Sequence, residues 1–123
     1  MDTHPSSPHT RIQNTLANSQ QTFLDLSNYN LHTLPDTFFT LTQLKRLHLE
    51  HNQLQHLPSS LSNLTQLRAL YLHSNQLQHL PSSLSNLIRL EHIHLDNNQL
   101  QHLPYSLSNL TRLELCEVGE GRW

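Results

Sequence analysis

Residues 52–64 read NQLQHLPSSLSNL, and the same thirteen letters return at residues 75–87. They return once more at residues 98–110 as NQLQHLPYSLSNL, in which Tyr105 is the only change. The step between copies is 23 residues. Self-similarity at a fixed period of about 20–50 residues indicates a repeat architecture, in which each repeat is one supersecondary unit. We therefore expect stacked units that share one continuous core.

Each full unit opens on a leucine. Three full units begin at Leu44, Leu67 and Leu90, a weaker copy begins at Gln21 and a partial one begins at Leu113. Apolar residues occupy positions 1, 4, 6, 11, 14, 18 and 21 of the unit. This spacing follows neither the period of a strand nor that of a helix throughout, and it fits one coil of a solenoid with inward leucines.

Within a unit, two short segments carry a local signal. Positions 3–7 alternate between apolar and polar residues, which predicts a short strand in every coil. The Pro-Ser-Ser sequence at positions 15–17 predicts a helical turn, with proline at its start and a serine as its cap.

The spelling L-x-x-L-x-L-x-x-N-x-L resembles the leucine-rich repeat family. The 23-residue unit, with Leu-Pro after the asparagine segment, is similar to the intracellular, Ras-group-related subclass, a pattern that is also common in bacterial proteins. The resemblance covers residues 21–118. It implies an α/β fold, namely a short, right-handed, curved leucine-rich repeat solenoid with a concave parallel β-sheet. In this family the concave sheet is the usual binding surface.

Four segments follow from these boundaries. They are a disordered leader over residues 1–10, a capping helix over residues 11–20, the repeat domain over residues 21–118 and a tail over residues 119–123. The leader is polar and contains proline, which disfavours a packed core. In the next segment Ile12 and Leu16 recur at helical spacing, so a short helix would cover the first coil.

The last unit is incomplete. Leu113, Cys116 and Val118 predict one more strand, with Cys116 as a small buried hydrophobe on a core position. No helix follows it in the sequence, and an uncovered strand edge invites pairing with another chain. A homodimer through this end, a short cap that includes Trp123 and a truncated product are the three alternatives that the sequence leaves open.

Asparagine occupies position 9 of the three full units, as Asn52, Asn75 and Asn98. The resemblance implies that this side chain turns inward and hydrogen-bonds the backbone of its own and neighbouring coils. The backbone leaves the strand at this point, so its polar groups need partners. In the first unit Tyr29 takes the position, and a neighbouring asparagine, Asn28 or Asn30, is the expected substitute.

The strand segments differ from unit to unit, whereas the thirteen-letter phrase is nearly fixed. We call the outward side chains of these strands and of the turns that follow them the concave face. It contains arginine and tyrosine, which are enriched at interaction hot spots. The sequence therefore predicts a face that binds a protein or peptide partner, the alternative being a solvated sheet of diverged duplicates. The residues predicted to contact the partner are Arg46, His48, Glu50, Tyr71, His73, His92, His94 and Asp96.

Eleven histidines are unusual in a chain of 123 residues. His92 and His94 lie two residues apart on one strand face, with His73 or Asp96 nearby, so these side chains are the candidates for a zinc-type site. The main expectation is nevertheless that the chain holds no metal and no cofactor. A histidine-rich metal-binding or pH-responsive protein is the first alternative function.

A second histidine column belongs to the repeated phrase and consists of His56, His79 and His102. Stacked coils would align these side chains, and their mutual repulsion would disfavour the protonated folded state. The sequence therefore predicts a loss of stability below about pH 6.

Other functional classes find little support. The net charge of −2 gives no basic face for nucleic acid. No apolar run reaches the roughly 18 residues of a membrane span, and the first residues lack the apolar stretch of a secretory signal, so a cytoplasmic protein without a membrane partner is expected. The two glycines both lie in the tail and no serine sits in a nucleophile motif, so no enzyme is expected. A truncated repeat fragment without independent function is the second alternative.

Overall fold

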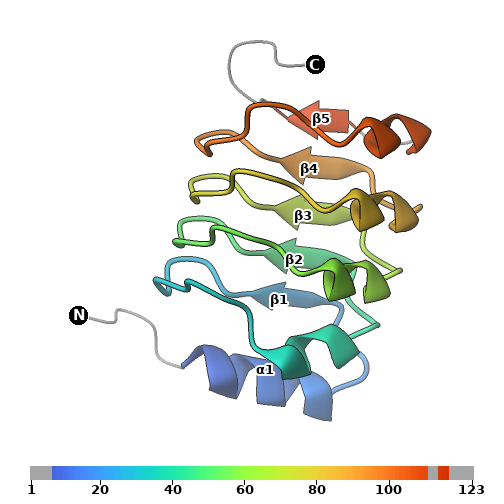
Figure 1. Cartoon of the computed structure of the whole chain (residues 1–123). Coiled ribbons are helices and arrows are strands. Elements are labelled where there is room, and N and C mark those ends of the chain that lie inside the picture. The colour runs from blue at the N-terminus through green and yellow to red at the C-terminus, as the bar shows by residue number, and fades with distance from the viewer. Residues whose placement is uncertain (1–6, 111–113, 117–123) are drawn as a thin grey trace.

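The computed structural model describes residues 7–110 and 114–116. Five parallel strands stack in chain order from β1 to β5 and form a single sheet (Figure 1). They are β1 (Phe23–Asp25), β2 (Arg46–His48), β3 (Ala69–Tyr71), β4 (His92–His94) and β5 (Glu114–Cys116). From β1 to β4 each strand pairs with the next one unit away, so that Leu24 pairs with Leu47 and Leu47 with Leu70. The last pair is shorter by one residue, because Ile93 pairs with Leu115, 22 residues on. The predicted leucine-rich repeat solenoid with a parallel sheet is confirmed.

The strands are short because only one residue in each faces the interior between two that face outward. The central residues Leu24, Leu47, Leu70 and Ile93 are buried. Successive side chains of a strand point to opposite faces of the sheet, so positions 3 and 5 of each unit stand on the concave face. Identical position numbers therefore form rows that run along the solenoid axis.

The opposite side of each of the first four coils carries a short 3₁₀ helix (Figure 1). These helices are η1 (Asp36–Thr40), η2 (Ser59–Asn63), η3 (Ser82–Asn86) and η4 (Tyr105–Asn109). A proline precedes each of them, and its fixed φ of about −65° suits the start of a helical turn. The predicted helical turn is confirmed, but the predicted serine cap is wrong, because no side chain caps these helices.

The serines of the repeated phrase have a different role. The hydroxyl of Ser83 donates to the backbone carbonyl of Ser59 at 3.4 Å, and that of Ser106 donates to the carbonyl of Ser82 at 3.1 Å. Neighbouring coils are thus tied together on this side as well. The side chain at the accepting position takes no part in these bonds, and Tyr105, which occupies it in the last full unit, is 94% exposed. This explains why the phrase tolerates its single change at this position.

One apolar column fills the solenoid from the helix at the N-terminal end to the last full coil. Its buried members include Leu44, Leu54, Leu61, Leu67 and Leu90. Fully burying one leucine is worth about 1.5–3 kcal/mol, but a single coil leaves its leucines open on both sides. Stacking closes those sides, which is why the unit must be repeated.

The N-terminal end of the core is covered by α1 (Pro8–Ala17). The helix begins three residues earlier than the sequence predicts, because the Ser7 side chain caps it by accepting from the Thr10 backbone N–H at 3.1 Å. Residues 8–10, expected in the disordered leader, are therefore helical, and residues 18–20, expected in the helix, are not. Residues 1–6, together with the predicted tail, lie outside the described residues.

The helix uses a different face from the one expected. Ile12 and Thr15 are buried against the first coil, whereas Leu16 is 40% exposed. The Thr15 hydroxyl donates to the carbonyl of Arg11 at 2.9 Å, which satisfies this polar group inside the core. The prediction that Leu16 covers the coil is wrong because the i, i+3 pair starting at Ile12 faces the leucines.

A left-handed residue ends the strand segment of each coil. The φ angles of Asn28, His51, Ser74 and Asn97 lie between 57° and 62°, and all four residues occupy position 8 of their units. Asparagine and, less often, histidine adopt this conformation among the non-glycine residues. The chain reverses here, and the asparagine of position 9 follows at once.

Candidate functional site

The turns behind the concave face are held by the asparagines of position 9. Asn75 donates from Nδ2 to the carbonyls of Leu49 and Leu72, both at 3.0 Å, and its Oδ1 accepts from the Leu54 N–H at 3.1 Å. It therefore ties its own coil to the preceding one at the end of the strand. Asn98 does the same one coil further on: its Nδ2 donates to the carbonyls of Leu72 and Leu95, and its Oδ1 accepts from the Leu77 N–H.

Asn52 fastens the first coil in the same way. Its Oδ1 accepts from the N–H groups of Tyr29 and Leu31, both at 3.0 Å, and its Nδ2 donates to the carbonyl of Leu26 at 2.9 Å. Tyr29 is half-buried against the core, with the guanidinium of Arg11 5.6 Å from its ring centre. The asparagine of the following coil thus supplies the bonds that the turn at Tyr29 requires.

Three rings stack across three coils at position 5 of the unit. The rings of His48 and Tyr71 are 4.2 Å apart and inclined by 3°, and those of Tyr71 and His94 are 4.8 Å apart and inclined by 26°. Strand pairing puts these residues in register, so their spacing is close to that of neighbouring strands. We call His48, Tyr71 and His94 the aromatic row.

Position 7 carries a second row, formed by Glu50, His73 and Asp96. The His73 ring lies 5.8 Å from that of His94, so the two rows touch. Glu50 Oε2 lies 3.2 Å from Nδ1 of His48, which anchors the start of the aromatic row. We call Glu50, His73 and Asp96 the acid–histidine row.

Two polar atoms of this second row are buried without a hydrogen-bond partner in the described part of the chain. They are Oε1 of Glu50 and Nδ1 of His73. Leaving a buried donor or acceptor unsatisfied costs about 1–3 kcal/mol, so each such atom in a folded protein requires an explanation. The His51 N–H donates to the carbonyl of His73 at 3.1 Å, so the two coils stay side by side after β2 and β3 end, and the two atoms belong to one region of the face.

The structure brings His73, His94 and Asp96 together. One ligand atom from each lies within 4.8 Å of the others, and all three side chains are partly buried. His92, the other histidine of β4 that the sequence singles out as a metal candidate, is not part of this group. Its place is taken by Asp96, because position 7 of the same coil lies beside position 7 of the preceding coil, where His73 stands.

His94 is held toward its neutral form. Burial lowers its pKa below the ordinary value of 6.5, and the neighbouring His73 and His92 lower it further. The carboxylates of Asp96 and Glu50 act in the opposite direction without reversing the shift. A neutral imidazole keeps a lone pair available for a proton, a hydrogen-bond donor or a metal.

A groove of about 620 Å³ borders the aromatic row on the side where the strands begin. Three basic residues at positions 2 and 3 of two successive coils line the groove: Lys45, Arg46 and Arg68. The single acidic residue in its lining is Glu91, so the groove is basic. Phe23 adds a ring that is 56% exposed, and Tyr71 joins the groove to the aromatic row. Arg46, Tyr71 and His92 were predicted for the face. Lys45 and Arg68 were missed, although comparing position 2 of every unit would have revealed them.

The family comparison agrees with this architecture. The family described as leucine rich repeat matches the chain over residues 22–77 and again over residues 89–110. The chain belongs to the leucine-rich repeat family. A search of curated proteins finds no match.

Solved leucine-rich repeat structures resemble this chain closely in fold. A leucine-rich repeat protein of Leptospira interrogans superimposes with a TM-score of 0.71 at 28% identity, over 89% of this chain and 33% of its own. An internalin of Listeria monocytogenes gives 0.71 at 27% identity, over 83% and 29%. The leucine-rich repeat domain of a Shigella effector gives 0.67 at 30% identity, over 84% and 44%. The chain thus spans less than half the length of these relatives.

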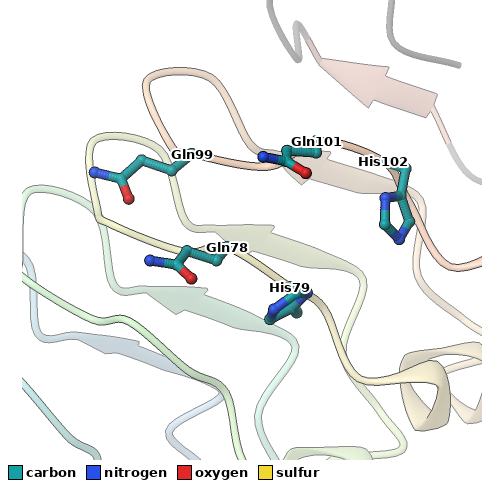
Figure 2. Close-up of a pocket in the computed structure, with 5 residues that line it drawn as sticks. All are labelled: Gln78, His79, Gln99, Gln101 and His102. Atoms are coloured by element: carbon teal, nitrogen blue, oxygen red, sulfur yellow. The ribbon is translucent and has the colours of Figure 1, made fainter.

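A second hollow lies outside the concave face, on the segments that lead from the strands to the 3₁₀ helices, which we call the return segments. This hollow, of about 310 Å³, is lined by Gln78, His79, Gln99, Gln101 and His102 (Figure 2). These amides and imidazoles come from two neighbouring coils. Because none is permanently charged, this surface serves as a comparison for the charged concave face.

Among the described residues, the single α-helix is ten residues long, and no helix has the length and apolar character that crossing a membrane requires. β5 is one of the two edge strands of the described sheet. The predicted core position of Cys116 is wrong, because the strand register pairs Cys116 with His94, a residue of the concave face, and gives the core position to Leu115, which pairs with Ile93. Val118 and the predicted cap at Trp123 lie outside the described residues, and the predicted dimer through this end stays a prediction.

Proposed function

We propose that this leucine-rich repeat chain is a non-catalytic module that binds a protein or peptide partner on its concave face. The observation that carries the proposal is the aromatic row, in which Tyr71 stacks between His48 and His94 beside a basic groove. Ordered rings present a large contact area and lose little conformational entropy on binding. Repeat proteins characteristically use such extended surfaces for recognition.

The arrangement of the rows suggests the chemistry of the partner. Basic side chains border the aromatic row on one side, and the acid–histidine row borders it on the other. A partner segment lying along the solenoid axis would place acidic side chains over Lys45, Arg46 and Arg68. Apolar or planar side chains would then rest on Tyr71. We therefore infer an amphipathic partner segment with an acidic edge, because complementary charge sets orientation and association rate.

The predicted contact residues fit this proposal to different degrees. Arg46 and His92 belong to the groove, His48, Tyr71 and His94 to the aromatic row, and Glu50, His73 and Asp96 to the acid–histidine row. Tyr71 is common to the groove and the row, so it is the expected hot spot. A location in the cytoplasm, and the lack of nucleic-acid and membrane partners, stay predictions from the sequence.

The test is affinity capture with three baits, each shown by circular dichroism to be folded at the temperature of the experiment. They are the wild type, an Arg46→Ala/Tyr71→Ala variant and a His79→Ala/His102→Ala variant altered in the hollow of Figure 2. We expect a partner that the wild type and the hollow variant retain and the first variant loses. With the purified partner, Tyr71→Ala should weaken binding by roughly 30-fold, as a hot spot of about 2 kcal/mol would.

A partner retained by the Arg46→Ala/Tyr71→Ala variant and lost by the hollow variant would move the binding surface to the return segments. Salt provides a second criterion. If acidic side chains occupy the groove, raising the ionic strength should slow association for the wild type more than for Arg68→Ala.

A further inference from the structure

The concave face contains a group of side chains whose composition is that of a metal site. His73 and His94 offer two imidazoles and Asp96 offers a carboxylate, with one ligand atom of each within 4.8 Å of the others. The three residues come from two adjacent coils, so the pairing of β3 with β4 holds their backbones in place. The sequence names these residues among its metal candidates but predicts no metal, because the spacing along a strand is looser than a zinc site requires and no cysteine joins it.

We propose that His73, His94 and Asp96 bind one divalent transition-metal ion of the zinc class, with the remaining coordination position open toward the concave face. Two imidazoles and one carboxylate with a free position form a common ligand set for zinc. Imidazole also suits nickel, copper and cobalt, whereas magnesium and calcium prefer oxygen ligands throughout.

The geometry requires only a small adjustment. Zinc lies about 2.0–2.2 Å from nitrogen and oxygen ligands, so the ligand atoms of a tetrahedral site lie roughly 3.3–3.5 Å apart. Atoms that are at most 4.8 Å apart must approach by no more than roughly 1.5 Å. All three residues are partly exposed, and rotation of their side chains can provide this movement without a shift of the strands.

An independent observation points to the same place. Nδ1 of His73 is buried and has no hydrogen-bond partner among the described residues. A metal ion bound at this atom would satisfy it, as a hydrogen bond would elsewhere in the core. The close neighbours of the ring are themselves polar, namely the rings of His51 and His94 and the carboxylate of Asp96.

Glu50 supports the site from the other side of His73. Backbone hydrogen bonds from Leu49 and His51 to the coil of His73 continue past the strands and place Glu50 on the coil beside it. Oε1 of Glu50 is the second buried atom without a partner in the described part of the chain. A carboxylate beside a metal-bound imidazole fixes the ring and raises its basicity. Glu50 and Asp96 together also offset the two positive charges of the ion.

Zinc titration by isothermal calorimetry, on chain without an affinity tag, tests the site. Eleven histidines give a background of weak binding, so a single saturable equivalent at micromolar zinc is the relevant signal. We expect this equivalent in the wild type and in two control variants, His92→Gln and His79→Gln/His102→Gln. Asp96→Asn and His73→Gln should weaken it at least tenfold, and magnesium should give no saturable binding.

Cobalt provides a readout that does not depend on heat. One equivalent of Co²⁺ should produce the visible absorption of a four-coordinate ion in the wild type, and Asp96→Asn should abolish it while circular dichroism stays unchanged. The proposal is overturned by the absence of a saturable equivalent, or by one that Asp96→Asn and His73→Gln retain. It is equally overturned if the His92 or the hollow variant loses the site.

Discussion

The ring of Tyr71 lies 4.2 Å from the ring of His48 and only 3° from parallel to it, although the two residues are 23 positions apart in the chain. His94 stacks on the other side of Tyr71 at 4.8 Å. A single side chain therefore links three coils on the outside of the sheet. The leucines link the same coils on the inside.

Replacing this ring should destabilise the fold in addition to weakening partner binding. An aromatic pair contributes about 0.5–1.5 kcal/mol beyond the area it buries, so Tyr71→Ala should lower the free energy of unfolding by roughly 1–3 kcal/mol. Tyr71→Phe keeps both stacks and should stay within about 0.5 kcal/mol of the wild type. Urea unfolding measures the difference.

Tyr105 provides the matched control because it is the same residue type, 94% exposed, on the return side of the coil. Tyr105→Ala should change the free energy of unfolding by no more than about 0.5 kcal/mol. Equal losses for Tyr71→Ala and Tyr105→Ala would show that the stacked rings contribute nothing specific.

Replacing the asparagine of position 9 should lower the free energy of unfolding by more than the small size of this side chain suggests. Asn75 is 7% exposed and bonds three backbone carbonyls and one N–H. Asn75→Ala leaves these buried backbone groups without partners, so the free energy of unfolding should fall by roughly 2–4 kcal/mol. Asn63, which is exposed, is the control, and Asn63→Ala should change it by less than about 0.5 kcal/mol. Similar values for the two variants would contradict this role.

Much of the fold could be predicted because the repeat aligns equivalent residues. Once Leu24, Leu47 and Leu70 occupy the same position of the unit, their pairing in a parallel sheet follows from the period alone. The capping helix does not repeat, so nothing in the sequence fixed its register, and Thr15 rather than Leu16 faces the core. Local capping by Ser7 decided where that helix begins.

For the concave face, the sequence predicts which residues lie in the same row, but not how their side chains are oriented. Position numbers indicate that His48, Tyr71 and His94 face outward together, but not that their rings are parallel. Likewise, the sequence offers both His92 and Asp96 as metal candidates beside His94, but it does not indicate which of them converges with the others. The choice of Asp96 over His92 depends on side-chain directions after the strand ends, where the left-handed residue Asn97 turns the chain.

That left-handed position is also a place where stability can be gained. Ser74 has a φ of 58°, whereas asparagine occupies the equivalent position at Asn28 and Asn97. Asparagine tolerates this conformation better than serine, so Ser74→Asn should raise the free energy of unfolding by roughly 0.5–1 kcal/mol. Chemical denaturation measures the gain. Ser74→Ala lacks the local hydrogen bonding of asparagine and should give none, and a destabilised Ser74→Asn variant would refute the argument.

The last prediction concerns pH. The folded-state pKa of His94 lies below 6.5, chiefly through burial and then through the nearby His73, so the unfolded chain binds this proton more readily. Stability should therefore be full above about pH 6.5 and should fall as the pH drops below that value toward the folded-state pKa. The side chains of His56, His79 and His102 are exposed, and His79 supplies the comparison for this measurement.

Melting temperatures between pH 7.5 and 5 test this direction, with His94→Gln and His79→Gln measured alongside the wild type. The wild type and His79→Gln should lose stability over this range, and His94→Gln should lose less, because the neutral amide has no proton to bind. The carboxylates of Asp96 and Glu50 face His94 and favour its charged form, so Asp96→Asn should make the loss steeper. A wild type that is as stable at pH 5 as at pH 7.5 would exclude His94 as the titrating group.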